Sequence, residues 1–244
     1  MLTLYIIFVF FFTDISVNYS YYLSIFKSTI SVFRKDIKSE IRNRYVINSL
    51  LMFVIITIAI IRFSIGDEKV EDSVLSGLFW IVIFFSAISG LARVFIKEEE
   101  TGTSLALKLS ADPSGVFLGK LLFNFILTFS LNLVIFFLFV LITDIRILNF
   151  PAFFLTVILG NFGIVSASTI IAAIIAKANS KGTLYPVLAF PVLLPLLLTL
   201  ISSTKLASEG ADTMALMSDY QILISYTVVI TTLSLLLFKH IWED

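Results

Sequence analysis

The chain has no cysteine, a single histidine and few charged residues among its 244 residues. Without cysteine it forms neither disulfides nor thiolate metal sites. Charged residues make up 14% of the chain, against about 25% in soluble domains, while 59% are hydrophobic. We find no nucleophile–base pair, no metal-ligand cluster and no nucleic-acid-binding patch in the sequence. These deficits argue against an enzyme and against a soluble domain, and they indicate a membrane protein.

Six apolar blocks are long enough to cross a membrane as helices. About 20 apolar residues span about 30 Å of hydrocarbon, and a helix pairs its own backbone groups inside lipid. The sequence therefore predicts an all-α membrane protein in which residues 25–244 form a single six-span domain. Residues 1–24 form an apolar N-terminal extension that we expect to be in-plane or disordered. The blocks cover residues 46–65, 75–96, 121–143, 151–176, 184–202 and 220–238.

Residues 26 to 45 differ from these blocks because their apolar residues recur every three or four positions. That spacing draws one stripe along a helix. The other faces carry six Lys or Arg residues, opposed only by Asp36 and Glu40. Such a helix is typical of the membrane interface, with its basic side chains toward anionic headgroups. A soluble partner helix is the alternative. The stripe consists of Phe26, Ile30, Phe33, Ile37, Ile41 and Tyr45.

The uneven distribution of lysine and arginine between the loops predicts the topology. Cytoplasmic loops are rich in these residues. If the basic helix lies inside, the basic residues between 93 and 120 and Lys239 also lie inside, and the acidic loop 67–72 lies outside. We therefore predict that both termini are cytoplasmic.

The stretch EEETGTSLALKLSADPSG, residues 98–115, is the one inner loop long enough for a helix of its own. Thr101 or Thr103 is the predicted N-cap, and Asp112-Pro113 the predicted stop. Leu105 and Leu109 are four residues apart and share a face, whereas Leu107 lies elsewhere. A short, partly apolar helix facing the cytosol indicates a protein partner. The alternative is a loop that folds back on the membrane surface.

The segment that follows is similar to a phosphate-binding loop only at first sight. Gly115-Val-Phe-Leu-Gly119-Lys120 is one residue too short, and no Ser or Thr follows the lysine. We interpret it as the start of span three, with Lys120 extending to the headgroups. An ATPase, if one is involved, is therefore a separate subunit.

Three tracts resemble a known family, the CcmB permeases of cytochrome c maturation, within the type-2 ABC exporter class. The resemblance runs from about residue 30 to the C-terminus. The first tract is Glu100-Thr-Gly102 followed by Leu107-Lys-Leu109-Ser110. The second is Phe117-Leu-Gly119-Lys120 with Asn124. The third is Pro186, Pro191 and Pro195, preceded by a span with Gly160 and Gly163. Two positions depart from the family: Asn132 replaces an acidic residue in span three, and an aromatic near Phe137 replaces a proline.

The resemblance implies a partnership in the bacterial cytoplasmic (inner) membrane. The partners would be a CcmA-like ATPase that binds ATP and magnesium, CcmC- and CcmD-like membrane subunits, and a CcmE-like periplasmic haem chaperone. Haem would be held by partner proteins, with no cofactor on this chain. ATP hydrolysis would release the haem-loaded chaperone, although an older view is haem export. The loop residues assigned to ATPase docking are Glu100, Gly102, Thr103, Leu105, Leu107, Leu109, Ser110 and Pro113.

The residue inventory favours transmission of motion over haem binding. His240 lies in the inner tail, and haem usually needs a His, Cys, Met or Tyr ligand. Polar and helix-distorting residues within spans are assigned to helix packing or to a hinge. Two other functions stay open: a type-2 permease that exports a lipid, glycan or drug, and a scaffold without an ATPase. A homodimer of this chain stays open as well. The packing or hinge residues are Asn132, Gly160, Asn161, Gly163, Pro186, Pro191 and Pro195.

Overall fold

The protein is a bundle of helices in the computed structural model, which describes residues 2–66, 68–143, 145–177 and 184–243. Side chains are described from residue 21 to residue 242 within those ranges. The described residues contain no strand. The helices are α1 (Leu2–Arg42), α2 (Tyr45–Ile65), α3 (Asp72–Leu91), α4 (Ile96–Glu100), α5 (Ser104–Ser110), α6 (Pro113–Thr143), α7 (Phe150–Lys177), α8 (Tyr185–Ser208) and α9 (Met217–Glu243).

Six segments of the described chain are long and apolar enough to cross a membrane, and this confirms the predicted six-span, all-α class. They are α2, α3 with α4, α6, α7, α8 and α9. Helix α6 begins eight residues before the predicted span. Pro113 occupies its first position, where a missing N–H costs nothing, and the Asp112 carboxylate accepts a hydrogen bond from the Ser114 N–H at 2.9 Å. The extra turns carry α6 to the end of the bundle.

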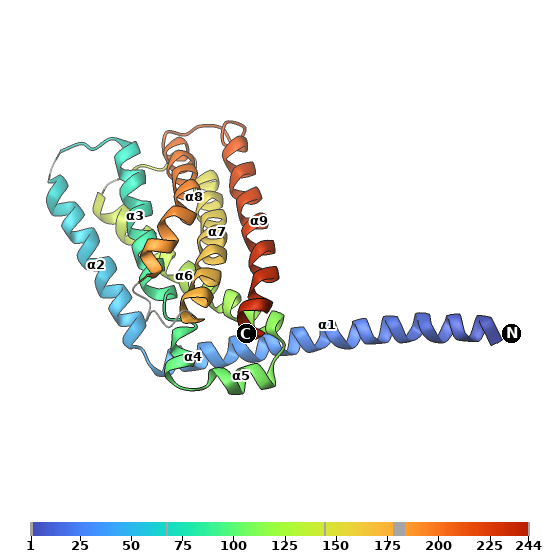
Figure 1. The fold of residues 1–244 in the computed structure, drawn as a ribbon. Helices are drawn as coiled ribbons and strands as arrows, with labels where there is room; N and C mark the ends of the chain where they lie inside the picture. The colour runs from blue at the N-terminus through green and yellow to red at the C-terminus, as the bar shows by residue number, and fades with distance from the viewer. Residues whose placement is uncertain (1, 67, 144, 178–183, 244) are drawn as a thin grey trace.

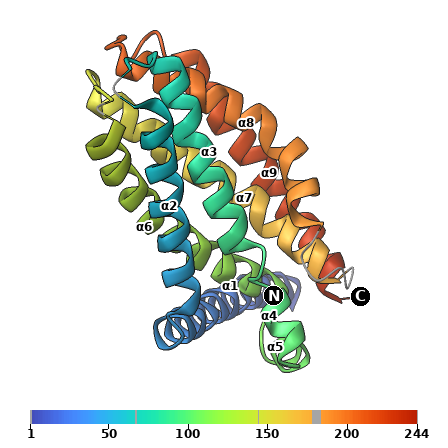
Figure 2. The same cartoon turned by 90° about the vertical axis from the view of Figure 1, so that its left-hand side faces the viewer.

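Helix α7 is the centre of the bundle and α2 lies at its edge (Figures 1 and 2). In the most apolar stretch of α7, 78% of the residues are buried, against 17% in α2. Small residues allow this packing: a Cβ at Gly160 would lie 2.5 Å from Trp80 Cη2, and one at Gly163 would lie 2.8 Å from Leu196 Cδ1. Helices α3 and α8 can therefore approach the α7 backbone closely.

Helix α1 lies across one end of the bundle, and its N-terminal part projects away from the spans (Figure 1). Residues 2–20 continue the same helix as the amphipathic segment. The side chains of residues 1–20, to which the predicted apolar extension largely belongs, lie outside the described part. The same end of the bundle holds α4, α5 and the C-terminal end of α9 (Figure 1).

Two glycines of α6 fix the seat of α1. A Cβ at Gly115 would lie 2.5 Å from Ser28 Cβ, and one at Gly119 would lie 2.8 Å from both the Thr29 carbonyl oxygen and Val32 Cβ. Gly115 and Gly119 are four residues apart and share a face, which is the small-residue spacing that lets helices approach closely. The segment that resembles a phosphate loop is thus a helix–helix contact.

Candidate functional site

The site begins with a bend at the C-terminal end of α3. That helix ends at Leu91, and a short turn leads into α4. Helix α4 ends at Glu100, and Gly102 takes a positive φ of 66°, a conformation that suits glycine. The chain then enters α5. We call residues 92–103 the elbow, because they turn the chain between a span and α5.

A buried ion network joins this elbow to α1 and α6. Lys120 of α6 is only 2% exposed. Its Nζ lies 2.8 Å from Glu98 Oε1 of α4 and 3.0 Å from Asp36 Oδ2 of α1. It also donates a hydrogen bond to the Val94 carbonyl at 3.0 Å. One ammonium group therefore holds three separate segments of the chain together.

Two further side chains complete the network. Lys35 Nζ pairs with Glu98 and lies 3.3 Å from Asp36 Oδ1. Burial lowers the pKa of Lys35, but the hydrogen bond to Glu98 and the charge of Asp36 outweigh it and raise the pKa above 10.5. Thr103 donates a hydrogen bond from its hydroxyl to Glu98 Oε2 at 2.7 Å. The residue just before α5 is thus tied to the same carboxylate.

The expectation that Lys120 extends to the lipid headgroups is wrong. Its ammonium group is inside the protein, since two carboxylates and a carbonyl replace the water it would otherwise need. The network as a whole was missed, although its members were visible. Three features of the sequence could have indicated it. Asp36 is an acidic residue on a basic helix, Glu98 is an acidic residue at the end of a span, and Lys120 directly follows two glycines four residues apart.

Helix α5 exposes two leucines on one face and packs its other face against the protein. Leu105 is 65% exposed and Leu109 is 82% exposed, whereas Leu107 is buried. The predicted division of these three leucines between faces is confirmed. The predicted stop is confirmed as well, because α5 ends at Ser110 and α6 begins at Pro113.

The prediction that Thr101 or Thr103 is the N-cap of α5 is confirmed for Thr103, but the expected capping hydrogen bond is not formed. Thr103 stands at the N-cap position, but its hydroxyl makes no capping bond and donates to Glu98 instead. The rest of the predicted docking set is divided. Glu100 is exposed and lies 3.9 Å from Arg93, and Ser110 is also exposed. Leu107 and Pro113 serve the fold, so the surface open to a partner is centred on Leu105 and Leu109.

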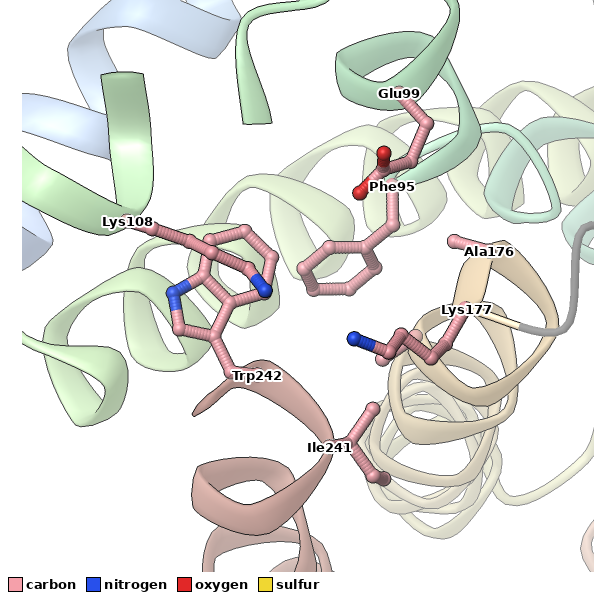
Figure 3. A pocket seen from close by; sticks show the side chains of 8 residues that line it. Phe95, Glu99, Lys108, Ala176, Lys177, Ile241 and Trp242 are labelled. Carbon is pink, nitrogen blue, oxygen red and sulfur yellow. The ribbon is translucent and has the colours of Figure 1, made fainter. Parts of the chain in front are cut away.

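An aromatic cluster supports α5 from behind (Figure 3). The Lys108 ammonium of α5 lies 5.6 Å from the centroid of the Trp242 ring, a cation–π distance. Trp242 of α9 packs on Phe238 and on Phe95 of the elbow, with ring centroids 5.4 and 6.1 Å apart. A small cavity of about 20 Å³ is bordered by Phe95, Lys108 and Trp242, together with residues of α7. The last helix is thereby joined to the elbow and to α5.

The amphipathic helix turns a different face to the bundle than the predicted stripe. Buried positions of α1 include Thr29, Val32, Asp36 and Glu40. The predicted apolar stripe lies beside these buried positions. Phe26 is 62% exposed and Ile41 is 60% exposed. The three stripe residues between them are half-buried: Ile30, Phe33 and Ile37. Polar and small residues therefore hold α1 to α6. The apolar stripe stays available to lipid, as an interfacial helix requires.

The amides inside the spans bond between helices. Asn132 of α6 donates to Asn161 Oδ1 of α7 at 3.0 Å, and Asn161 donates to the Phe125 carbonyl at 3.3 Å. Asn124 donates to the Thr169 hydroxyl at 2.8 Å. These contacts, with the close packing at Gly160 and Gly163, support the packing interpretation of the intramembrane residues.

Helix α8 passes through its prolines without ending. Pro186 lies in the first turn, and Pro191 and Pro195 lie inside the helix. Each interior proline removes a backbone hydrogen bond. The Tyr226 hydroxyl of α9 donates to the Val192 carbonyl at 2.9 Å, in the turn before Pro195. A neighbouring helix thus bonds to the backbone near the interruption. The hinge role of these prolines stays a prediction.

The fold and this site define a class: a multi-pass membrane permease subunit with an in-plane entry helix and an exposed helix between its second and third spans. A protein-family model described as "CcmB protein" matches residues 27–241. The chain therefore belongs to the CcmB family. It is a membrane subunit of the haem-export and cytochrome c maturation ABC system, which includes an ATPase and other Ccm subunits. No curated protein matched the chain.

Proposed function

We propose that this subunit receives the motion of a CcmA-like ATPase at α5 and passes it into the spans through the Lys120 network. The observation that carries the proposal is the pair Leu105 and Leu109, which are 65% and 82% exposed on a helix whose base is fixed. Exposed leucines on a short, anchored helix suit insertion into an apolar cleft on a partner. The orientation follows the basic residues, with α5 and both termini in the cytoplasm.

The path of transmission is short. Thr103, one residue before α5, bonds to Glu98, and Glu98 pairs with Lys120 at 2.8 Å. Lys120 belongs to α6, which continues as the third span, and Asp36 ties α1 to the same point. Ion pairs of this geometry resist separation, so a displacement of α5 would move the elbow, α1 and α6 together. The aromatic contact between Lys108 and Trp242 would add α9.

The energy that enters at α5 would be used at the opposite face, where we propose that it releases the haem-loaded periplasmic chaperone. CcmC- and CcmD-like subunits would complete the complex in the bacterial inner membrane. This chain would transmit motion without holding haem. Among the side chains that could serve as haem ligands, two are exposed. The one histidine, His240, is exposed at the cytoplasmic end of α9, and Met52 is 60% exposed on the face of α2 that points away from the bundle.

The docking experiment replaces Leu105 and Leu109 with glutamate in the complete complex. We expect co-purification of the ATPase to fall at least tenfold while the subunit still inserts in the membrane. The control places two glutamates at Thr213 and Met214, which are exposed at the other end of the bundle. Normal recovery of the ATPase with the leucine variant would overturn the proposal, because the ATPase would then dock at another surface. Failure of the wild-type subunit to retain any ATPase would favour a scaffold that works without one.

A second experiment follows haem. The L105E/L109E variant should stop cytochrome c assembly and leave haem-loaded chaperone trapped on its partner, whereas His240→Ala should leave assembly near normal. The purified subunit alone should bind haem weakly. A stoichiometric haem spectrum from the subunit alone, lost when one of its own side chains is replaced, would instead support haem export by this chain.

A further inference from the structure

A large cleft lies at the same end of the bundle as the elbow. Its volume is about 840 Å³, and its walls come from α1, α2, the last turn of α3, the elbow and α6. Ligand-binding clefts are typically about 300–1,000 Å³. The cleft borders the ion network, since Asp36, Glu98 and Lys120 lie in its wall. It is distinct from the exposed leucine face of α5.

The lining of the cleft has two chemically different parts. One part is apolar and is built from Val46, Val94, Phe123 and Leu127, which belong to α2, the elbow and α6. The other part is charged, with six basic and four acidic side chains, so the lining has a net charge of +2. An occupant that matches both parts carries an anionic group and an apolar chain.

Lys38 and Arg42 are the basic residues best placed to take that anionic group. They are four residues apart on α1 and share a face. Within the described part of the chain neither has an acidic partner, whereas Lys35 and Lys120 are paired with Glu98. Two basic side chains without a counter-charge favour an anion, and a guanidinium group suits a phosphate in particular.

We propose that this cleft binds one anionic phospholipid, with its phosphate at Lys38 and Arg42 and an acyl chain along Val46, Val94 and Leu127. A lipid fits better than a soluble anion because the apolar wall is formed by spans and because α1 lies at the membrane interface. The lipid would lie against the elbow and brace the network from the side. This inference does not depend on docking of an ATPase.

The test uses the full chain in mild detergent and native mass spectrometry. Dioleoyl phosphatidylglycerol, dioleoyl phosphatidylcholine and inorganic phosphate are titrated separately. We expect one phosphatidylglycerol to be retained, with at least fivefold weaker retention of phosphatidylcholine and no stabilisation by phosphate alone. The K38A/R42A variant should lose at least fivefold in phosphatidylglycerol affinity. The K27A/R34A variant removes two basic side chains of α1 outside the cleft and should stay within twofold of wild type.

The outcomes separate a built site from general charge attraction. K38R/R42K keeps both charges and should retain the lipid. Equal losses in K38A/R42A and K27A/R34A, or equal retention of both lipids, would overturn the proposal, and so would stabilisation by phosphate alone. If K38A/R42A does not fold, the wild-type chain is cross-linked with phosphatidylglycerol that carries a diazirine on its acyl chain. Adducts should map to residues 46–50, 90–94 and 123–127, and labelling spread evenly over the spans would contradict the site.

Discussion

Two close helix contacts in this protein are held by opposite means. In the membrane, α7 is pressed against α3 and α8 at Gly160, where Trp80 and Leu200 fill the space that a side chain would take. At the end of the bundle, α1, the elbow and α6 meet through Lys120, Glu98 and Asp36. The first contact depends on shape and the second on charge. Four experiments test that difference, ordered from the largest expected effect to the smallest.

Lys120→Met should be the most damaging change. It leaves two neighbouring carboxylates, on Asp36 and Glu98, with only Lys35 as a counter-charge. Removing one partner of a buried ion pair costs about 3–5 kcal/mol. The free energy of unfolding in mixed micelles measures the loss. Lys239→Met, at an exposed position of α9, is the control and should change stability by about 0.5 kcal/mol or less.

Adding Glu98→Gln to Lys120→Met should restore part of that stability, because only one carboxylate, on Asp36, then has to be balanced by Lys35. If Lys120→Met were as stable as the Lys239 control, the network would contribute little to the fold. The contrast between a helix contact held by charge and a helix contact held by shape would then not hold.

Gly160→Ala should cost about 1–3 kcal/mol, the usual range for overpacking a tight contact. The new Cβ would lie 2.5 Å from Trp80 Cη2 and 2.8 Å from Leu200 Cδ2, so these side chains, or the helices that carry them, must shift. Gly77→Ala in α3 is the matched control. A Cβ at that position meets nothing within 4 Å, so the change should be neutral or stabilising. Equal effects at the two glycines would show that α7 is not packed as described.

The hydrogen bond between Asn132 and Asn161 should contribute a smaller amount. Interhelical hydrogen bonds in membrane proteins average about 0.6 kcal/mol in double-mutant cycles. Asn132 and Asn161 are replaced by alanine, singly and together, and the free energies of unfolding of the three variants, relative to wild type, give the coupling energy between the two side chains. A second cycle between Asn161 and Ser130 should give no coupling, because the Ser130 hydroxyl bonds to its own helix at the Ile126 carbonyl. Similar couplings in both cycles would contradict a specific pair.

Glu40→Gln should have the smallest effect, at most about 1 kcal/mol. Burial raises the pKa of Glu40 above 4.5, Lys97 opposes the rise and Asp36 adds to it. Its charged form is therefore disfavoured in the fold, and its Oε1 has no hydrogen-bond partner among the described residues. As pH rises from 4.5 through the raised pKa, Glu40 should reduce stability. Glu40→Gln should remove that pH-dependent loss, and Glu68→Gln, in an exposed loop, should not. A pH profile unchanged by Glu40→Gln would contradict this assignment.

The spans were predictable because their signal is local. Each apolar block is long enough to be recognised alone, and all six correspond to helices of the structure. The turn signals were local too: Pro113 starts α6, and Leu105, Leu107 and Leu109 divide between faces as their spacing predicts. The family tracts led to the same class, which the family match confirms.

The position of Lys120 was not predictable in this way. Glu98 is 22 residues from it and Asp36 is 84 residues from it, so no local pattern joins them. A lysine at the start of a span normally extends toward water. Here Gly115 and Gly119 bring α1 so close that its acidic residue reaches the lysine first.

The sequence by itself determined which segments enter the membrane, because the cost of placing charge and unpaired backbone in lipid acts residue by residue. It also determined that a short helix forms in the connection between the second and third spans. Only the tertiary structure decided which face of α1 meets the bundle, where the cleft lies and which charges are buried. Those outcomes depend on contacts between helices that are far apart in the sequence. Close packing at Gly115 and Gly119 brings α1 against α6 and thereby determines which ion pairs form.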